Sequence, residues 1–122
     1  MKVAAAVPRV RVADCDFNAS EIIRCVNEAV SMEVQVIVFP ELCITGYSCG
    51  DLFFQETLLH GAMQSLRQIA DATLQQEIIV IVGMPLAVES LLLNTGVVLQ
   101  RGRMLGVVPK SYLPNYKEFQ EK

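Results

Sequence analysis

The stretch Val34–Glu41, which reads VQVIVFPE, decides the fold class of this 122-residue chain. Its first six residues are nearly all apolar and β-branched, which is typical of a strand covered on both faces. The stretch Ile78–Val82 (IIVIV) has the same character. Two such strands that alternate with amphipathic helices predict one α/β domain with a layered sheet.

The segments around these two strands complete the predicted sheet. Lys2–Val7 is expected to form a first strand, and Leu91–Leu99 and Met104–Val108 flank a turn that is typical of an antiparallel hairpin. The hairpin would make the sheet mixed. We expect Gly83 and Pro85 to end the strand that begins at Ile78, because proline donates no hydrogen bond to a ladder.

Two amphipathic helices are predicted between the strands. The first would follow a loop at Ala13–Phe17, with Asn18 as its N-cap in a capping box completed by Glu21. The second is expected from about Thr57 to Gln75, where apolar residues recur at helical spacing.

Composition and charge narrow the classes of function. Hydrophobic residues make up 52% of the chain, which excludes intrinsic disorder. The net charge of -3 lacks the basic excess of a nucleic-acid binder. No stretch resembles a secretory signal or a membrane span, so we expect a cytoplasmic protein with no membrane partner. The mean hydropathy of +0.40 is high for a short chain, so we expect an apolar surface that needs a cover, and a homo-oligomer.

The cysteines and the single histidine predict no metal site. The chain has no CxxC pair, and His60 is its only histidine, so a zinc site of normal spacing cannot be assembled. The four cysteines, which are Cys15, Cys25, Cys43 and Cys49, are expected to be reduced thiols.

Glu41 is the first candidate for chemistry, because it follows a strand of the buried type. Ligands gather at the carboxyl ends of strands in open α/β sheets, and a carboxylate in that place suits a general base. On position alone, Glu41 could equally be a loop glutamate that points into solvent.

Lys110 is the second candidate, since it follows Gly106–Pro109 (GVVP) and should lie just past a strand of the buried type. A lysine held near a carboxylate can stabilise a developing oxyanion, although an isolated lysine is more often simply solvated. We expect Glu41 and Lys110 to lie at the same end of neighbouring strands, within about 4–6 Å of each other.

Cys43, two residues from Glu41, is expected to be a small buried thiol and not a nucleophile.

Two stretches resemble the nitrilase, or carbon–nitrogen hydrolase, superfamily. Val36–Leu42 (VIVFPEL) resembles its carboxylate motif, and Cys43–Phe53 (CITGYSCGDLF) resembles the glutaminase domain of glutamine-dependent NAD synthetases. Pro109–Phe119 (PKSYLPNYKEF) is similar to their lysine motif. The resemblance implies an α-β-β-α sandwich, of which residues 1–122 would be the amino-terminal portion, with helices on one face of a mixed sheet.

The resemblance also implies roles for individual residues. Glu41 matches the general base, and Lys110 matches the lysine that supports the oxyanion. Glu118 matches a second glutamate that orders the site, although the family's Glu-Phe-Tyr-Glu reads Glu-Phe-Gln-Glu here. Tyr47 and Tyr116 match tyrosines that line the glutamine pocket; on spacing alone, ordinary packing tyrosines explain them better.

The nucleophilic cysteine of the family lies on a later strand, and none of the four cysteines matches its motif. The resemblance therefore implies that the nucleophile, the rest of the glutaminase domain and the synthetase domain lie outside these residues, so that this chain alone is inactive. In the parent ligase, glutamine would supply ammonia for the amidation of deamido-NAD, with ATP and magnesium bound by the synthetase domain. No cofactor is expected in this chain.

Two alternatives remain open. A stand-alone amidase of the superfamily would share Glu41 and Lys110, although the TGYSCGDLF run argues against it. A non-catalytic interaction domain would use the apolar surface for oligomer contacts.

Overall fold

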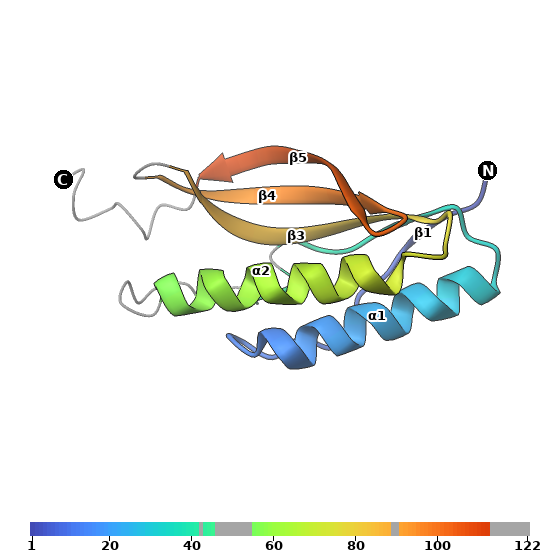
Figure 1. Ribbon diagram of the computed structural model, residues 1–122, viewed down its shortest axis with the longest axis horizontal. Helices are drawn as coiled ribbons and strands as arrows, with labels where there is room; N and C mark the ends of the chain where they lie inside the picture. Colours follow the sequence, from blue (N-terminus) through green and yellow to red (C-terminus); the bar gives the residue numbers. More distant parts are fainter. Residues whose placement is uncertain (42, 46–54, 89–90, 113–122) are drawn as a thin grey trace.

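A five-stranded sheet organises the part of the chain that the structure describes (Figure 1). The computed structural model describes residues 1–41, 43–45, 55–88 and 91–112. The elements in chain order are β1 (Val3–Ala5), α1 (Cys15–Ser31), β2 (Val36–Val38), α2 (Gln55–Ala72), β3 (Ile79–Val88), β4 (Leu91–Gln100) and β5 (Arg103–Tyr112). The strands lie in the order β1-β2-β3-β4-β5, with parallel pairing up to β3 and antiparallel pairing after it. The predicted mixed α/β sheet is confirmed.

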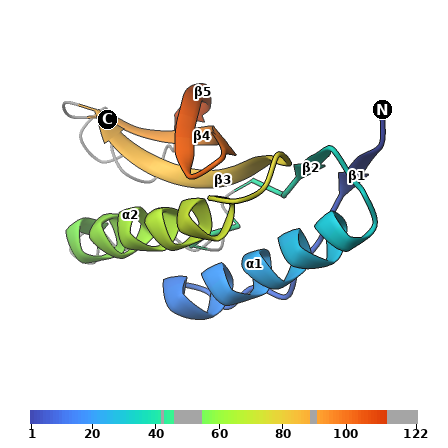
Figure 2. The ribbon, with the colours of Figure 1, turned by 45° about the vertical axis from the view of Figure 1, so that its right-hand side comes forward.

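Both helices cover the same face of the sheet (Figures 1 and 2). The units β1-α1-β2 and β2-α2-β3 advance in the same direction across the sheet, and right-handed crossovers then place their helices on one side. The core lies between the helices and the sheet, where the fully buried side chains include Ile22 and Val26 of α1, Ile69 of α2, and Val80 and Val82 of β3. The prediction of helices on one face is therefore confirmed.

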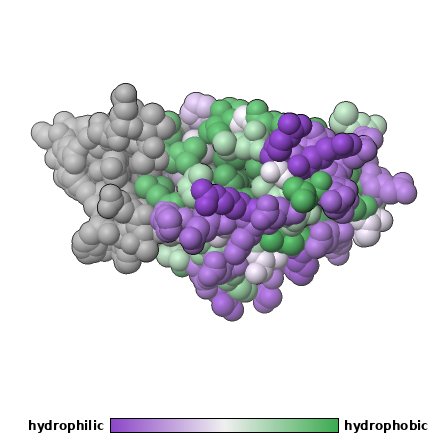
Figure 3. All heavy atoms as spheres, viewed as in Figure 1, coloured by the Kyte–Doolittle hydropathy of each residue, from purple (hydrophilic) through white to green (hydrophobic). Residues whose placement is uncertain are grey.

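The opposite face of the sheet carries no helix in the described ranges (Figure 1). Side chains alternate along a strand, so Ile79, Ile81 and Val98 lie on this open face, where they are partly exposed. Val3 and Val108 lie there too and are 59% and 53% exposed. In Figure 3 apolar residues gather over the sheet, whereas polar residues dominate over the helices. The expectation of an apolar surface is met, and what covers it stays a prediction.

Helix α1 begins earlier than predicted. Its N-cap is Asp14, whose carboxylate accepts a hydrogen bond from the Phe17 N–H at 3.1 Å. The residues from Cys15 to Phe17, expected as loop, therefore form the first turn. Asn18 is not the cap but lies inside the helix, fully buried. Aspartate and asparagine cap about equally well, so the local pattern could not choose between these two starts.

Strand β3 does not end at Gly83 or Pro85, as predicted, but continues to Val88. Odd-numbered residues of β3 direct their backbone groups toward β2, since the Ile79 N–H donates to the Gln35 carbonyl and the Ile81 carbonyl accepts from the Phe39 N–H. Pro85 is also odd-numbered, so its backbone nitrogen faces the β2 side of β3, and it lies past the end of β2. Its missing N–H therefore leaves no gap in the β3–β4 ladder.

The β4–β5 hairpin is confirmed, with a two-residue turn at Arg101 and Gly102. Their φ angles are 54° and 77°, which is the left-handed pair that a type I′ turn requires. Strand β5 runs on to Tyr112, so Lys110 lies within a strand and not past its end. β5 is also not of the buried type, because it forms the edge of the sheet and Met104, Leu105 and Val108 are more than half exposed.

The remaining boundaries differ by a few residues. β1 and β2 are each three residues long, shorter than Lys2–Val7 and Val34–Phe39, and α2 begins and ends slightly before the predicted Thr57–Gln75. Neither helix that the structure describes is long and apolar enough to cross a membrane.

Candidate functional site

The loop that carries Glu41 is held against β3. The Phe39 N–H donates to the Ile81 carbonyl at 2.9 Å, and the Ile44 N–H donates to the Gly83 carbonyl at 3.3 Å. Between these two bonds lies Glu41, in a turn and exposed to solvent. The chain after β2 therefore continues along β3, so the position of Glu41 is tied to the sheet on both sides.

Lys110 occupies a bulge in β5. Asn94 pairs with Ser111 and the next residue, Thr95, pairs with Pro109, which leaves Lys110 as the extra residue on its strand. Bulges bend a strand and redirect a side chain, and they are frequent beside active sites. The Lys110 Cε atom comes within 3.5 Å of the place that a Cβ atom on Gly96 would occupy. The lysine side chain thus lies across β4 at a residue with no side chain of its own.

Two paired glycines connect the Glu41 loop to Lys110. Gly83 of β3 pairs with Gly96 of β4. Gly83 binds the loop at Ile44, and Gly96 lies beneath the stem of Lys110. The sheet therefore brings the two predicted charged residues to the same end, and both are exposed.

The prediction that their strands are neighbours is wrong. Glu41 follows β2 whereas Lys110 belongs to β5, and β3 and β4 lie between them. The hairpin adds its strands in chain order, so β5 becomes the edge of the sheet. The separation of about 4–6 Å between the two charges stays a prediction.

Three further candidates, Tyr47, Tyr116 and Glu118, lie outside the described residues, as does Cys49. Their assigned roles in glutamine binding and in ordering the site stay predictions.

The described cysteines have the character of structural thiols. Cys15, Cys25 and Cys43 form no disulfide within the described residues. Burial raises the pKa of Cys43 to about 11, although a hydrogen bond from the Gly83 N–H opposes this shift. Burial, with Asp16 and Asp14 nearby, raises the pKa of Cys15 to about 11. Burial also raises the pKa of Cys25, against the opposing effect of Arg24.

Reactive cysteines have a lowered pKa and partial exposure. None of these three thiols has both properties, and the prediction of Cys43 as a buried thiol is confirmed by its 2% exposure. Within the described residues, no three His, Cys, Asp or Glu side chains are grouped where they could hold a metal ion.

Two residues near this end of the sheet, Gly96 and Asn18, have roles that the sequence does not predict. Gly96 receives the stem of Lys110, and no local signal marks it. Asn18 was interpreted as a helix cap, yet its side-chain amide donates to the Ile44 carbonyl in the Glu41 loop at 2.7 Å. No local signal indicates this role, because the burial of Asn18 and its partner Ile44 are apparent only in the folded structure.

Comparison with known proteins identifies relatives for the whole chain. The model of the carbon-nitrogen hydrolase family matches residues 2–122. The glutamine-dependent NAD(+) synthetase of Mycobacterium leprae is 36% identical over 122 residues, which is 100% of this chain and 18% of the relative. The crystal structure of a glutamine-dependent NAD(+) synthetase from Cytophaga hutchinsonii superposes with a TM-score of 0.81 and 28% identity, over 91% of this chain and 19% of that one.

A smaller enzyme shares the fold. An amidase from Nesterenkonia superposes with a TM-score of 0.76 over 96% of this chain and 46% of its own, at 22% identity. Identity at that level shows a common fold alone. The chain spans about a fifth of the length of the curated synthetases that it matches.

Proposed function

Because this chain belongs to the carbon–nitrogen hydrolase family, we propose that it is the amino-terminal portion of the glutaminase domain of a glutamine-dependent NAD synthetase. The observation that carries the proposal is the 36% identity to such a synthetase along all 122 residues. The common location of the Glu41 loop and Lys110 at one end of the sheet supports it independently.

In the proposed reaction Glu41 is the general base and Lys110 is the cation. Glu41 accepts the proton of a cysteine thiol, and the thiolate attacks the carboxamide carbon of glutamine. The Lys110 ammonium stabilises the oxyanion of the tetrahedral intermediate. The proton passes to the leaving nitrogen and ammonia departs, and a water activated by Glu41 then hydrolyses the thioester to glutamate.

The nucleophile is assigned to a part of the enzyme outside these residues. The raised pKa values of Cys15, Cys25 and Cys43 suit structural thiols, and Cys49 does not match the nucleophile motif of the family. We expect residues 1–122 alone to release no ammonia from glutamine, because acyl transfer of this kind needs the thiolate.

The remaining parts of the proposal follow from the family. Tyr47 and Tyr116 would line the glutamine pocket, and Glu118 would order the site. The ammonia would amidate deamido-NAD in an ATP- and magnesium-dependent domain elsewhere in the enzyme, which we place in the cytoplasm.

The test uses the full-length enzyme with Glu41→Ala and Lys110→Ala. Each variant should abolish NAD formation with glutamine and retain it with free ammonia, because the amidating domain is untouched. Glu28→Ala and Arg67→Ala change exposed charges on the two helices and should leave both reactions unchanged.

Three results would contradict the proposal. Full glutamine-dependent activity in Glu41→Ala would remove the base from the mechanism. A failure of ammonia to restore NAD formation would show that the residue serves folding. An enzyme that forms no NAD from ammonia even as wild type would instead be an amidase of the same family.

A further inference from the structure

We propose that Asn18 is a positioning residue for the Glu41 loop, an inference that rests on the function proposed above. Asn18 lies in α1, is 0% exposed, and uses all of its amide groups in three hydrogen bonds to other segments. A buried side chain of this kind fixes the relative position of the backbones that it joins.

The three bonds of Asn18 join two loops. Its Oδ1 atom accepts from the Arg11 N–H at 2.7 Å, and its Nδ2 atom donates to the Arg11 carbonyl at 2.8 Å. The second Nδ2 proton goes to the Ile44 carbonyl at 2.7 Å. Two carbonyl acceptors and one N–H donor fix which end of the amide is nitrogen.

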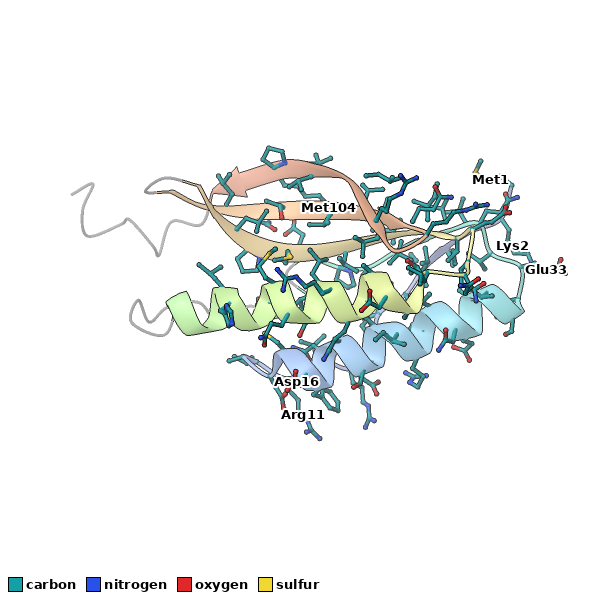
Figure 4. The ribbon with its side chains drawn as sticks, in the orientation of Figure 1. Met1, Lys2, Arg11, Asp16, Glu33 and Met104 are labelled. Carbon is teal, nitrogen blue, oxygen red and sulfur yellow. The ribbon has the colours of Figure 1, made fainter. Side chains whose placement is uncertain are left out.

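A second hydrogen bond also joins the loop before α1 to the Glu41 loop. The Ala13 N–H donates to the Thr45 carbonyl at 2.7 Å, so Asn18 of α1 and Ala13 of the preceding loop bind two successive carbonyls of the Glu41 loop. Arg11, in that loop, is itself held to α1, because its guanidinium lies 3.9 Å from the centroid of the Phe17 ring. Figure 4 shows Arg11 beside the first turn of α1, close to Asp16 and far from Met1 and Lys2.

The Glu41 loop is thus bound on both sides. Gly83 of β3 accepts from the Ile44 N–H, and Asn18 donates to the carbonyl of the same residue. Ile44 is held at both of its backbone polar groups, three residues after Glu41. A shift of about 1 Å in a catalytic group can lower a rate by about a hundredfold, so the loss of one of these anchors should affect the chemical step.

Asn18→Asp tests this role in the full-length enzyme. The substitution keeps the shape and the acceptor for the Arg11 N–H, but it places a carboxylate against two carbonyl oxygens. We expect kcat of the glutamine-dependent reaction to fall roughly tenfold or more, with a small change in KM for glutamine and an unchanged reaction with free ammonia. Protonation restores one O–H donor, so the activity of this variant relative to wild type should rise as the pH falls.

Thr73→Val is the matched control. Thr73 is also fully buried, and its hydroxyl accepts from the Gly102 N–H and donates to the Ala70 carbonyl. It precedes β3, at the end of the sheet away from Glu41. Its loss should lower the melting temperature and leave kcat with glutamine unchanged.

The outcomes separate the two proposals. Normal kcat in a folded Asn18→Asp enzyme, or an equal kcat loss in Thr73→Val, would overturn the role of Asn18 while leaving Glu41 as the base. Activity retained in Glu41→Ala would overturn the proposed function itself. If Asn18→Asp does not fold, Asn18→Ser keeps one donor and one acceptor, and it must show the same selective loss of kcat for the inference to stand.

Discussion

Lys110 lies across Gly96, with its Cε atom 3.5 Å from the position that a Cβ atom on residue 96 would take. The Cγ2 atom of Ile81 lies 3.9 Å from the same position. The stem of Lys110 therefore occupies the space that a side chain at position 96 of β4 would otherwise fill.

Substitution of Gly96 should misdirect Lys110. Alanine adds only a methyl group in ordinary contact, so Gly96→Ala should have little effect, whereas the branched side chain of Gly96→Val would occupy the path of the lysine stem. We expect Gly96→Val to lower kcat with glutamine roughly tenfold to a hundredfold and to leave the ammonia reaction intact. Gly106→Val, at a site with no atom within 4 Å, is the control, and an equal loss in that variant would contradict the prediction.

Gly102 should resist substitution for a different reason. Its φ of +77° lies in the left-handed region, and a Cβ atom there would overlap the Leu74 side chain. Gly102→Ala should therefore lower the free energy of unfolding by about 1–2 kcal/mol from the backbone alone. Denaturant titration measures the loss, and Gly106→Ala should cost far less. Equal effects at the two glycines would contradict the assigned turn.

The Cys43 thiol should make stability depend on alkaline pH. Its pKa is raised from 9.0 to about 11 in the folded protein, so between these values the folded state keeps a proton that the unfolded state loses. The contribution is fully present below pH 9 and is lost as the pH rises toward 11, by about 2–3 kcal/mol in total.

Denaturant midpoints at pH 8.5 and 10.5 measure this loss. Cys43→Ala should be less stable at pH 8.5 because of the cavity, yet it should lose less on going to pH 10.5 than the wild type does. Arg67→Ala, on the surface of α2, should keep the wild-type pH dependence. An unchanged pH dependence in Cys43→Ala would contradict the prediction.

The open face of the sheet should make residues 1–122 self-associate when they are produced alone. Val108 is 53% exposed on this face, so Val108→Lys should reduce the apparent mass in light scattering and weaken the binding of an apolar dye. Met32→Lys, an exposed apolar site on the helix layer, is the control. A stable monomer at low concentration with no dye binding would exclude this interface.

The sequence predicted the elements better than their lateral arrangement. The β-branched run of β2 and the Arg101–Gly102 turn are local signals, and a strand and a hairpin turn form at these places, although β2 is shorter than predicted. The neighbours of β2 are decided by packing across the sheet, which no local pattern encodes, and so the adjacency of the Glu41 and Lys110 strands was predicted wrongly. The predicted strand end at Pro85 is wrong for the same reason, since the cost of a proline depends on which side of β3 has a partner.

In the candidate site, too, local features could be predicted from the sequence and long-range features could not. Glu41 and Lys110 could be identified because charged residues after apolar runs are conspicuous in a sequence. The bulge that places Lys110 over Gly96 depends on a register shift between two strands. The bonds of Asn18 depend on a loop 26 residues away. Neither long-range relationship has a local signature.

The arrangement of the sheet in chain order has a consequence for how the protein folds. From β1 to β5 each strand pairs with the next one along the chain, and β3, β4 and β5 make long antiparallel pairs across short connections. Such local contacts need little loop closure and form quickly. β1 and β2 offer three residues each and depend on docking of the helices. Amide protons of β4 should therefore be the last to exchange with deuterated solvent and those of β1 the first, so the strand that bears Lys110 would be in place before the loop that bears Glu41.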